Sequence, residues 1–182
     1  MSDTRALSEL ILRLARLELA GAWQDDLNPA QRAALAYLAR ANRFSRAPSQ
    51  VADYLGTTRG TVSQTLKALG NKGHIAAEAA PGDRRSIRYR VTDRGRAEVA
   101  LRGGLEPALA ELDPETRGAL HTLLDDLLGK AIQANRSRPF GLCEDCAHFR
   151  PDGPGGFCKL LLESLAPEEK RQICHEQTPR AL

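Results

Sequence analysis

The sequence lacks the features that mark membrane and secreted proteins. No run of uncharged apolar residues reaches the roughly 18 that a membrane-spanning helix needs. The first residues, MSDTRALSEL, have neither the apolar block nor the small-residue cleavage site of a signal peptide. We therefore expect a cytoplasmic protein without a membrane partner.

Catalytic motifs are also missing. The chain has no GxSxG, no phosphate-binding P-loop, no HExxH and no dinucleotide-binding fingerprint. Its CxxC pair lacks the strand–helix context of a thioredoxin-like redox site. The sequence therefore predicts a protein that is not an enzyme.

Composition and charge indicate a globular protein with a basic middle. Of the 182 residues, 42% are apolar and 27% are charged, which suits one compact domain with a small appendage. The net charge is +3, but residues 43–96 hold eleven Lys or Arg against four Asp or Glu. This surplus suits contact with a polyanion such as nucleic acid, and the alternative is a solvated charged face.

Helical periodicity dominates the first 73 residues. The pattern predicts four helices, over residues 7–17, 28–45, 48–55 and 59–72. Asn28 and Thr58 are suited to cap the second and the fourth, and Gly56 ends the third. Two short helices joined by a tight turn form a helix-turn-helix pattern.

After Gly73 the apolar period changes from 3.6 to 2. Residues 74–80 and 87–91 read as two strands of a hairpin with a basic tip and one basic face. A helix capped by Thr92 is predicted to run unevenly past Gly103, and Asp113-Pro114 opens a last long helix.

The first and last long helices carry leucine stripes that a small head does not need. We expect them to pack on each other and on a second copy of the chain. The alternative is that they only complete the core of a single chain.

The fourth predicted helix has a buried and an exposed face. Its Val62, Leu66 and Leu69 share one side, which turns outward a small polar surface comprising Gly60, Thr61, Ser63, Gln64, Lys67 and Asn71. Such a helix fits the major groove of DNA, where Gln64 can bond adenine and Thr61 and Ser63 can bond a base or a phosphate. Arg59 and Lys67 are expected on phosphates, which fix register without reading sequence.

Two segments resemble regulators of the MarR family. DRRSIRYRVTDRG, residues 83–95, is similar to their D-x-R wing followed by a hydrophobic-T-x-x-G helix start, and TTRGTVSQTLKALGNKGHI, residues 57–75, resembles their recognition helix. The resemblance covers about residues 5–136. It implies a mainly α fold with a small β-hairpin wing (α+β), with a winged helix-turn-helix head and a dimerisation stalk of long helices.

The same resemblance implies function. The chain would be a homodimeric transcriptional regulator, a repressor, that binds a pseudo-palindromic operator in double-stranded DNA. Arg85 would enter the minor groove with Asp83 steadying it, and Arg84 and Arg88 would meet phosphates. A rival hypothesis is an interaction module whose winged helix docks a protein, but the basic wing favours DNA.

All four cysteines fall in the last 40 residues, with the spacing C-x2-C-x11-C-x15-C: Cys143, Cys146, Cys158 and Cys174. Four thiolates are the ligand set of a zinc ion or of an iron–sulfur cluster. A reducing compartment disfavours a structural disulfide. The spacing therefore predicts a metal lobe over residues 139–182, following a DNA-binding and dimerisation domain over residues 1–138.

Two features favour an iron–sulfur cluster, of the 4Fe-4S or 2Fe-2S type. Cys158 and Cys174 are lone residues rather than a second close pair, and three phenylalanines lie in or beside the lobe sequence. Zinc and a thiol–disulfide switch remain the alternatives, and His148 and His175 are alternative ligands. We expect the lobe to act through the end of the stalk, so that the loaded protein binds operator more tightly; the opposite sign stays open.

Overall fold

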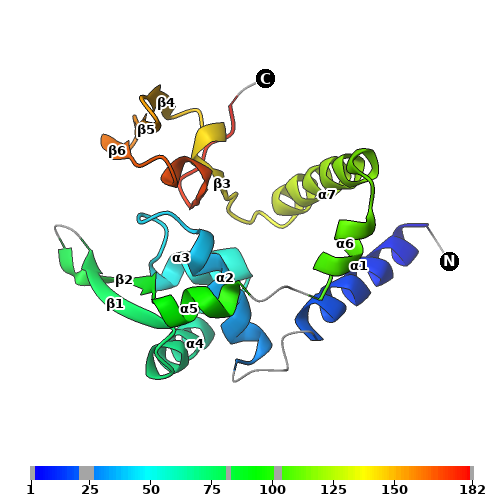
Figure 1. The fold of residues 1–182 in the computed structure, drawn as a ribbon, viewed down its shortest axis with the longest axis horizontal. Coiled ribbons are helices and arrows are strands. Elements are labelled where there is room, and N and C mark those ends of the chain that lie inside the picture. Colours follow the sequence, from blue (N-terminus) through cyan, green and yellow to red (C-terminus); the bar gives the residue numbers. More distant parts are fainter. Residues whose placement is uncertain (1–2, 21–26, 81–82, 101–103, 181–182) are drawn as a thin grey trace.

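The computed structural model describes residues 3–20, 27–80, 83–100 and 104–180, with the backbone alone for residues 20, 80 and 83–86. Four helices and a hairpin form a head with the element order of a winged helix (Figure 1). These elements are α2 (Pro29–Arg40), α3 (Pro48–Leu55), α4 (Arg59–Asn71), β1 (Ile75–Ala80), β2 (Asp83–Val91) and α5 (Asp93–Val99). The predicted fold class, mainly helical with a small β wing, is confirmed.

Local signals set the ends of the helices in the head. The Asn28 side chain accepts from the Gln31 backbone N–H at 2.9 Å, as predicted for the cap of α2. Gly56 ends α3 with φ 60°, a left-handed conformation that glycine adopts without strain. Helix α2 ends at Arg40, before the predicted residue 45, because Ala41 is extended and forms a β-bridge with Ile173.

Aliphatic side chains from α2, α3, α4 and the wing meet in one core. Leu35, Leu38, Leu66 and Leu69 are at most 1% exposed. Fully burying one such side chain stabilises the fold by about 1.5–3 kcal/mol. The core therefore fixes which face of α4 is left for solvent.

The hairpin is tied to the helices at its base. β1 and β2 are antiparallel, with Ile75 opposite Val91. Thr92 Oγ1 donates to the Gly73 carbonyl at 2.7 Å and accepts from the Gly95 N–H at 3.1 Å. A Cβ on Gly95 would meet the His74 carbonyl at 2.2 Å, so only glycine lets α5 approach β1 this closely. These contacts explain the T-x-x-G pattern at this point of the chain.

Three further helices form an arm beside the head: α1 (Asp3–Ala20), α6 (Glu106–Glu111) and α7 (Pro114–Ala134). The Leu105 N–H donates to Glu18 at 2.8 Å, which joins α6 to the end of α1. The single uneven helix predicted past Gly103 is wrong, since α5 ends at Val99 and α6 begins at Glu106; Gly103 itself lies outside the described residues.

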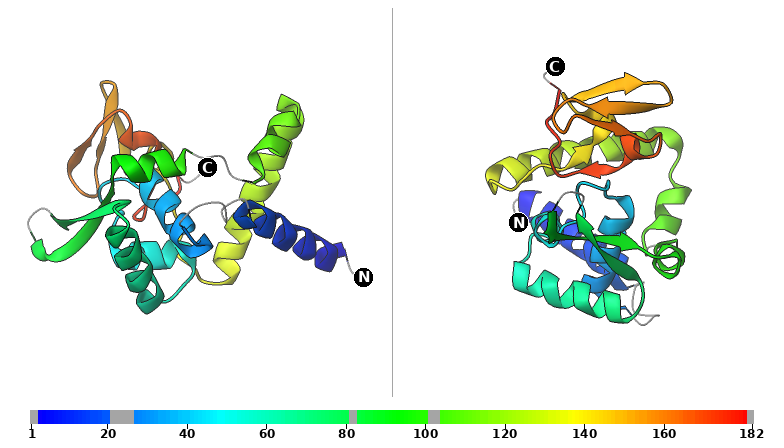
Figure 2. Two further views of the ribbon diagram at one scale, coloured as in Figure 1. Left: turned by 60° about the horizontal axis from the view of Figure 1, so that its bottom comes forward. Right: turned by 90° about the vertical axis from the view of Figure 1, so that its left-hand side faces the viewer.

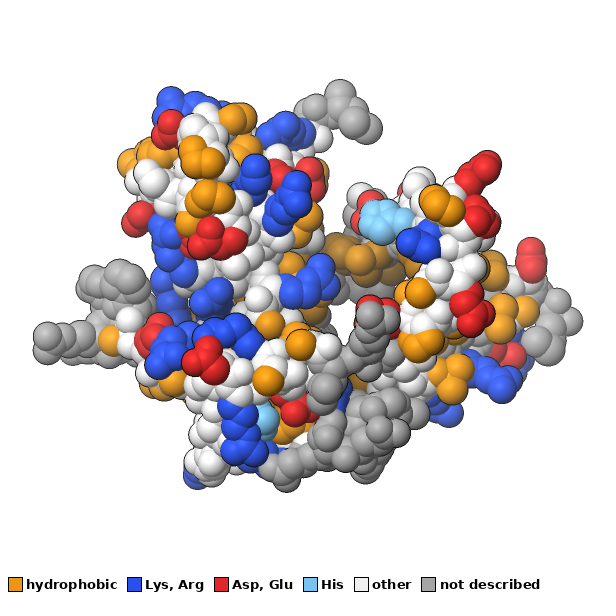
Figure 3. Space-filling view, in the orientation of Figure 1, with side chains coloured by type: hydrophobic (Ala, Val, Ile, Leu, Met, Phe, Trp, Pro, Cys, Tyr) orange, Lys and Arg blue, Asp and Glu red, His pale blue; other side chains and the backbone are white. Residues whose placement is uncertain are grey.

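The leucine stripes of α1 and α7 are exposed. Leu10 is 57% exposed and Leu123 is 69% exposed. Hydrophobic side chains are visible on the surface of the arm, on the right of Figure 3. The stripes therefore do not complete the core of the single chain, nor do they bury each other within it. None of the helices in the described part of the chain is long and apolar enough to cross a membrane.

The cysteine-rich segment forms a small lobe of short elements: β3 (Gly141–Leu142), η2 (Cys143–Asp145), β4 (Phe149–Asp152), β5 (Gly155–Cys158), β6 (Glu163–Leu165), η3 (Glu169–Arg171) and β7 (Ile173–Cys174). β3 pairs with β7, and β4, β5 and β6 form an antiparallel sheet in that order. The lobe lies on the head, on the side opposite α4 (Figures 1 and 2). Hydrogen bonds from Asn42 and Arg43 join the head to the lobe. The expectation that the lobe acts through the end of the stalk stays a prediction.

Candidate nucleic-acid interface and cysteine site

Helix α4 presents the face that the sequence predicts. Val62, Leu66 and Leu69 are buried, so Gly60, Gln64, Lys67 and Asn71 are exposed on the other side. The helix carries no acidic side chain, and its N-terminus, where backbone N–H groups attract anions, is on the same exposed surface. This face can enter a groove of DNA without a repulsive charge.

The flanks of α4 are arranged by its cap. Thr58 Oγ1 accepts from the Thr61 N–H at 3.2 Å and bonds the Thr61 hydroxyl at 2.9 Å, so that hydroxyl is shared with the cap. The side chains of Arg59 and Ser63 are exposed and form no hydrogen bond with described residues. Both are free to meet a phosphate or a base.

The wing carries the remaining residues expected at DNA. Asp83 lies on β2 opposite Ala80, but the side chains of Asp83, Arg84 and Arg85 are outside the described residues. The Arg88 guanidinium is half-buried and donates to the Arg43 carbonyl at 3.2 Å. Arg88 therefore points to the loop between α2 and α3, on the side of the wing that faces the lobe.

The lobe brings all four cysteines to one small enclosed space, which is lined by Cys143, Cys146, His148, Phe149, Cys158, Leu160, Leu165, Cys174 and Glu176. Strand pairing produces this convergence. β3 beside β7 sets Gly141 opposite Cys174, and β4 beside β5 sets Phe149 opposite Cys158. The predicted set of four thiols is thus assembled from residues up to 31 positions apart in the sequence.

Several N–H groups point at the sulfur atoms. Cys146 Sγ lies 3.5 Å from the His148 backbone nitrogen and 3.4 Å from that of Thr178. Cys143 Sγ accepts from the Asn42 side chain at 3.3 Å. Hydrogen bonds of this kind stabilise a thiolate and tune a metal centre that it holds.

Cys143 and Cys174 affect each other's pKa. The hydrogen bond from the Cys143 thiol to Cys174 raises the pKa of Cys143, and burial raises it further. The same bond lowers the pKa of Cys174 to about 6, against burial and in the same direction as the Asn42 carboxamide. The hydrogen bond therefore favours a thiolate at Cys174 over one at Cys143.

The four thiols are the right type of ligand for a zinc ion or an iron–sulfur cluster, but their positions are not those of a formed site. The volume of the enclosed space is about 20 Å³, which is enough for roughly one water molecule. Among the described side chains, no three or more of His, Cys, Asp or Glu stand in the arrangement of a metal site. The thiols would have to shift to hold a single ion, and would have to shift further to hold a cluster.

The two histidines beside the cysteines differ in position. His148 lines the enclosed space with the thiols. His175 is buried on the other side of β7, where its ring nitrogens lie near Arg138, Gln50 and Glu176. His148 thus remains an alternative ligand, whereas His175 joins the lobe to the head.

The surface of the head on which the lobe lies was not predicted from the sequence. The Asn42 N–H donates to the Ile173 carbonyl at 2.9 Å, and the His175 N–H donates to Ser45 Oγ at 2.8 Å. Phe140 packs edge-on against Tyr54, with ring centroids 5.1 Å apart. Asn42, Ser45 and Pro48 are residue types that favour turns, so they could have indicated that a loop begins here.

Comparison with known proteins matches the head to a known family and fold. The family model of the MarR family matches residues 25–86. The head has the MarR-type winged helix fold. Streptococcus pneumoniae FabT in complex with DNA is similar with a TM-score of 0.57 and 20% identity, over 72% of this chain and 96% of that one. The MepR–DNA complex of S. aureus has a TM-score of 0.55 and 18% identity, over 71% and 98%.

A MarR transcriptional regulator from Methanosarcina mazei Go1 is similar at a TM-score of 0.57 and 19% identity, over 72% of this chain and 96% of that one. At this identity the likeness shows that the two chains share a fold. The comparison with curated proteins found no match. The MarR-type match ends at residue 86, so the cysteine lobe lies outside it.

Proposed function

We propose that this protein is a dimeric, DNA-binding transcriptional regulator of the MarR type, a repressor, whose operator affinity is controlled by a group held on four cysteines. The observation that carries the proposal is that one chain contains two sites. A MarR-type head exposes a polar α4 face, and a lobe seated on that head gathers Cys143, Cys146, Cys158 and Cys174.

DNA binding is supported by the chemistry of the exposed face of α4. Gln64 stands one helical turn beyond Gly60, and Lys67 follows on the same side, so an amide and a cation are presented to a groove together. Glutamine can form two hydrogen bonds with adenine, and lysine neutralises a phosphate. Solved DNA complexes of FabT and MepR, which share the fold, support the same use of this head.

A second copy of the chain is supported by the exposed leucines of the arm. They lie on α1 and α7 and include Leu7, Leu10, Leu14, Leu17, Leu123, Leu124, Leu127 and Leu128. An exposed apolar surface of this extent on two helices of the arm marks an interface. Two heads joined through such a stalk would read two half-sites about 34 Å apart.

The group on the cysteines is proposed to be an iron–sulfur cluster, with a zinc ion as the alternative. Lone third and fourth thiols and the apolar lining by Phe149, Leu160 and Leu165 favour the cluster. A cluster would supply one-electron redox chemistry and sensitivity to oxidants or iron supply. The chain's own part is to present the thiols, to exclude water and to donate N–H groups to the sulfurs.

Protein purified without oxygen tests the proposal. We expect visible absorption with iron and sulfide in stoichiometric amounts, and operator binding by fluorescence anisotropy that tightens about 5- to 150-fold when the group is loaded, a coupling of about 1–3 kcal/mol. Colourless protein with one zinc ion would select the alternative. Equal operator affinity of the loaded and the stripped protein would make the group purely structural.

A further inference from the structure

The loop between α2 and α3, residues 41–47, touches both the cysteine lobe and the wing. On the lobe side, Ala41 bridges Ile173 and the Asn42 N–H donates to the Ile173 carbonyl at 2.9 Å. On the wing side, the Tyr89 N–H donates to the Arg46 carbonyl at 3.0 Å. One short segment of the head therefore connects the cysteine site to an element expected at DNA.

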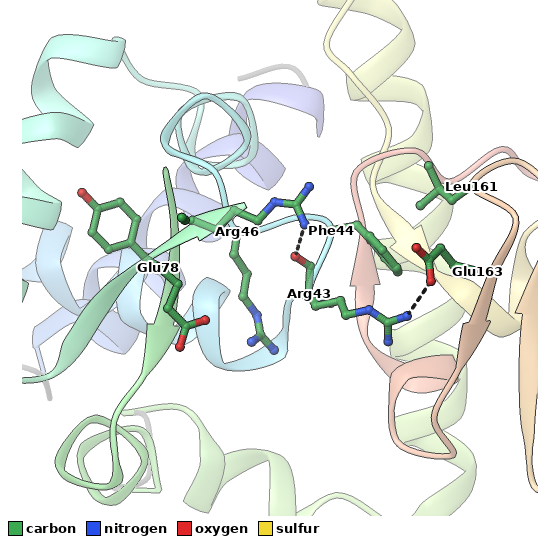
Figure 4. Close-up of a pocket in the computed structure, with 9 residues that line it drawn as sticks. Arg43, Phe44, Arg46, Glu78, Leu161 and Glu163 are labelled. Atoms are coloured by element: carbon green, nitrogen blue, oxygen red, sulfur yellow. Dashed lines mark hydrogen bonds and ion pairs between the residues drawn. The ribbon is translucent and has the colours of Figure 1, made fainter. Parts of the chain in front are cut away.

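Arg43 strengthens both connections (Figure 4). Its guanidinium donates to the Ser164 carbonyl at 2.8 Å and forms an ion pair with Glu169 of the lobe. It also forms an ion pair with Glu163, which is drawn as a dashed line in Figure 4. Its own carbonyl accepts from Arg88 of β2 at 3.2 Å. Beside these contacts a cavity of about 600 Å³ separates much of the wing from the lobe. The loop, rather than a broad interface, is thus the route between them.

Asn42 is the residue of this loop that reaches the sulfur atoms. It is fully buried, its Nδ2 lies 3.3 Å from Cys143 Sγ, and its Oδ1 accepts from the Phe44 N–H at 3.1 Å. Every polar group of the side chain is therefore committed, on one side to the cysteine site and on the other to the loop itself.

The contact between Asn42 and Cys143 depends on how firmly the sulfur is held in place. A sulfur that ligates a metal would be fixed by that bond, whereas a sulfur of a stripped site is held by the lobe alone. Loading the cysteines would therefore tighten the hold on residues 41–47.

We propose that Asn42 is a positioning residue that couples the cysteine site to DNA binding, through residues 41–47 and the wing rather than through the dimer stalk. The inference rests on the proposed function, because it names the route of that regulation. In the loaded protein, the bond to Cys143 fixes the loop against which Arg88 and Tyr89 set the base of the wing. In the stripped protein this anchor is weak and the wing loses its support.

The test compares Asn42→Asp with a matched control, Asn28→Asp, in the full-length protein. A carboxylate in place of the Asn42 carboxamide retains the acceptor for Phe44 but loses the donor to sulfur, whereas aspartate at the Asn28 cap position serves as well as asparagine. Operator affinity is measured by anisotropy for the loaded and the stripped form of each. We expect a ratio of at least about fivefold for the parent and for Asn28→Asp, and a ratio within about twofold of one for Asn42→Asp.

Amide hydrogen exchange on the parent protein provides a second readout that does not depend on DNA or on folding of the variant. Residues 41–47 should exchange at least about tenfold faster after the group is stripped. A parent-like affinity ratio in Asn42→Asp, or equal protection of this loop in both forms of the parent, would overturn the proposal. A ratio of one in the parent itself would instead overturn the proposed function.

Discussion

The head buries leucine, isoleucine and valine from α2, α3, α4 and the wing, whereas the lobe buries sulfur. The core of the lobe consists of Cys143, Cys174 and Leu165, and Phe44 of the head packs against it. Thiols contribute little apolar area, so such a core gains less from the hydrophobic effect than an aliphatic one. We therefore expect the lobe, more than the head, to depend on a group bound to its thiols and on the surface beneath it.

The largest expected effect is the loss of the lobe's group without loss of the head. Cys146→Ser removes one of four sulfur ligands, and we expect essentially all bound metal and visible absorption to disappear, because ligation supplies the folding free energy of such small sites. Helical content and the cooperative unfolding of the head should persist. Metal and sulfide analysis with circular dichroism measures both.

Ala147→Ser is the control, since it adds the same hydroxyl at the next, exposed position. Full metal content and absorption in Cys146→Ser would remove Cys146 from the ligand set. His148, which lines the same space, would then be the next residue to change.

The second prediction concerns the aliphatic core of the head. Leu66 is 1% exposed at the centre of that core, so Leu66→Ala should lower the free energy of unfolding by about 2–5 kcal/mol. Leu162 in the lobe is 76% exposed, and Leu162→Ala should change it by less than about 0.5 kcal/mol. Denaturant titration of the loaded proteins gives both values, and equal losses would mean that the two regions do not differ as described.

The head could be predicted from the sequence because its signals are local. The apolar faces at helical spacing, the caps Asn28 and Thr58, and Gly56 at the end of α3 each act within one or two turns of the residues that they organise. The exposed face of α4 followed from the positions of Val62 and Leu66 alone. The early end of α2 could not be predicted, since the β-bridge that pulls Ala41 out of the helix comes from Ile173.

The cysteine spacing predicted the four thiols, but nothing in the sequence predicted the seat of the lobe. Asn42 and Cys143 are 101 positions apart, and such a contact leaves no periodic pattern. Proximity in sequence suggested instead that the lobe would act on α7, which it follows directly. Strands of two to four residues also lack the alternation by which a strand is recognised.

The smallest expected effect separates base reading from control. If Gln64 reads a base pair from α4 while the lobe acts on the opposite side of the head, Gln64→Ala should reduce the preference at one position of each half-site by about 1–3 kcal/mol. That loss should be the same in the loaded and the stripped protein, because contributions of independent sites add to within about 0.5 kcal/mol. Lys67→Ala is the matched comparison on the same face; it should weaken all sequences alike and lower the salt slope by about one unit. These effects are measured by anisotropy titrations against operators with single substitutions, in both forms and at several salt concentrations. The titrations give the loss of base preference for Gln64→Ala in each form, and the affinity and salt slope for Lys67→Ala. If the loss of base preference in Gln64→Ala depended on the state of the cysteines, the lobe would reorient α4 itself. Its effect would then not be confined to the wing.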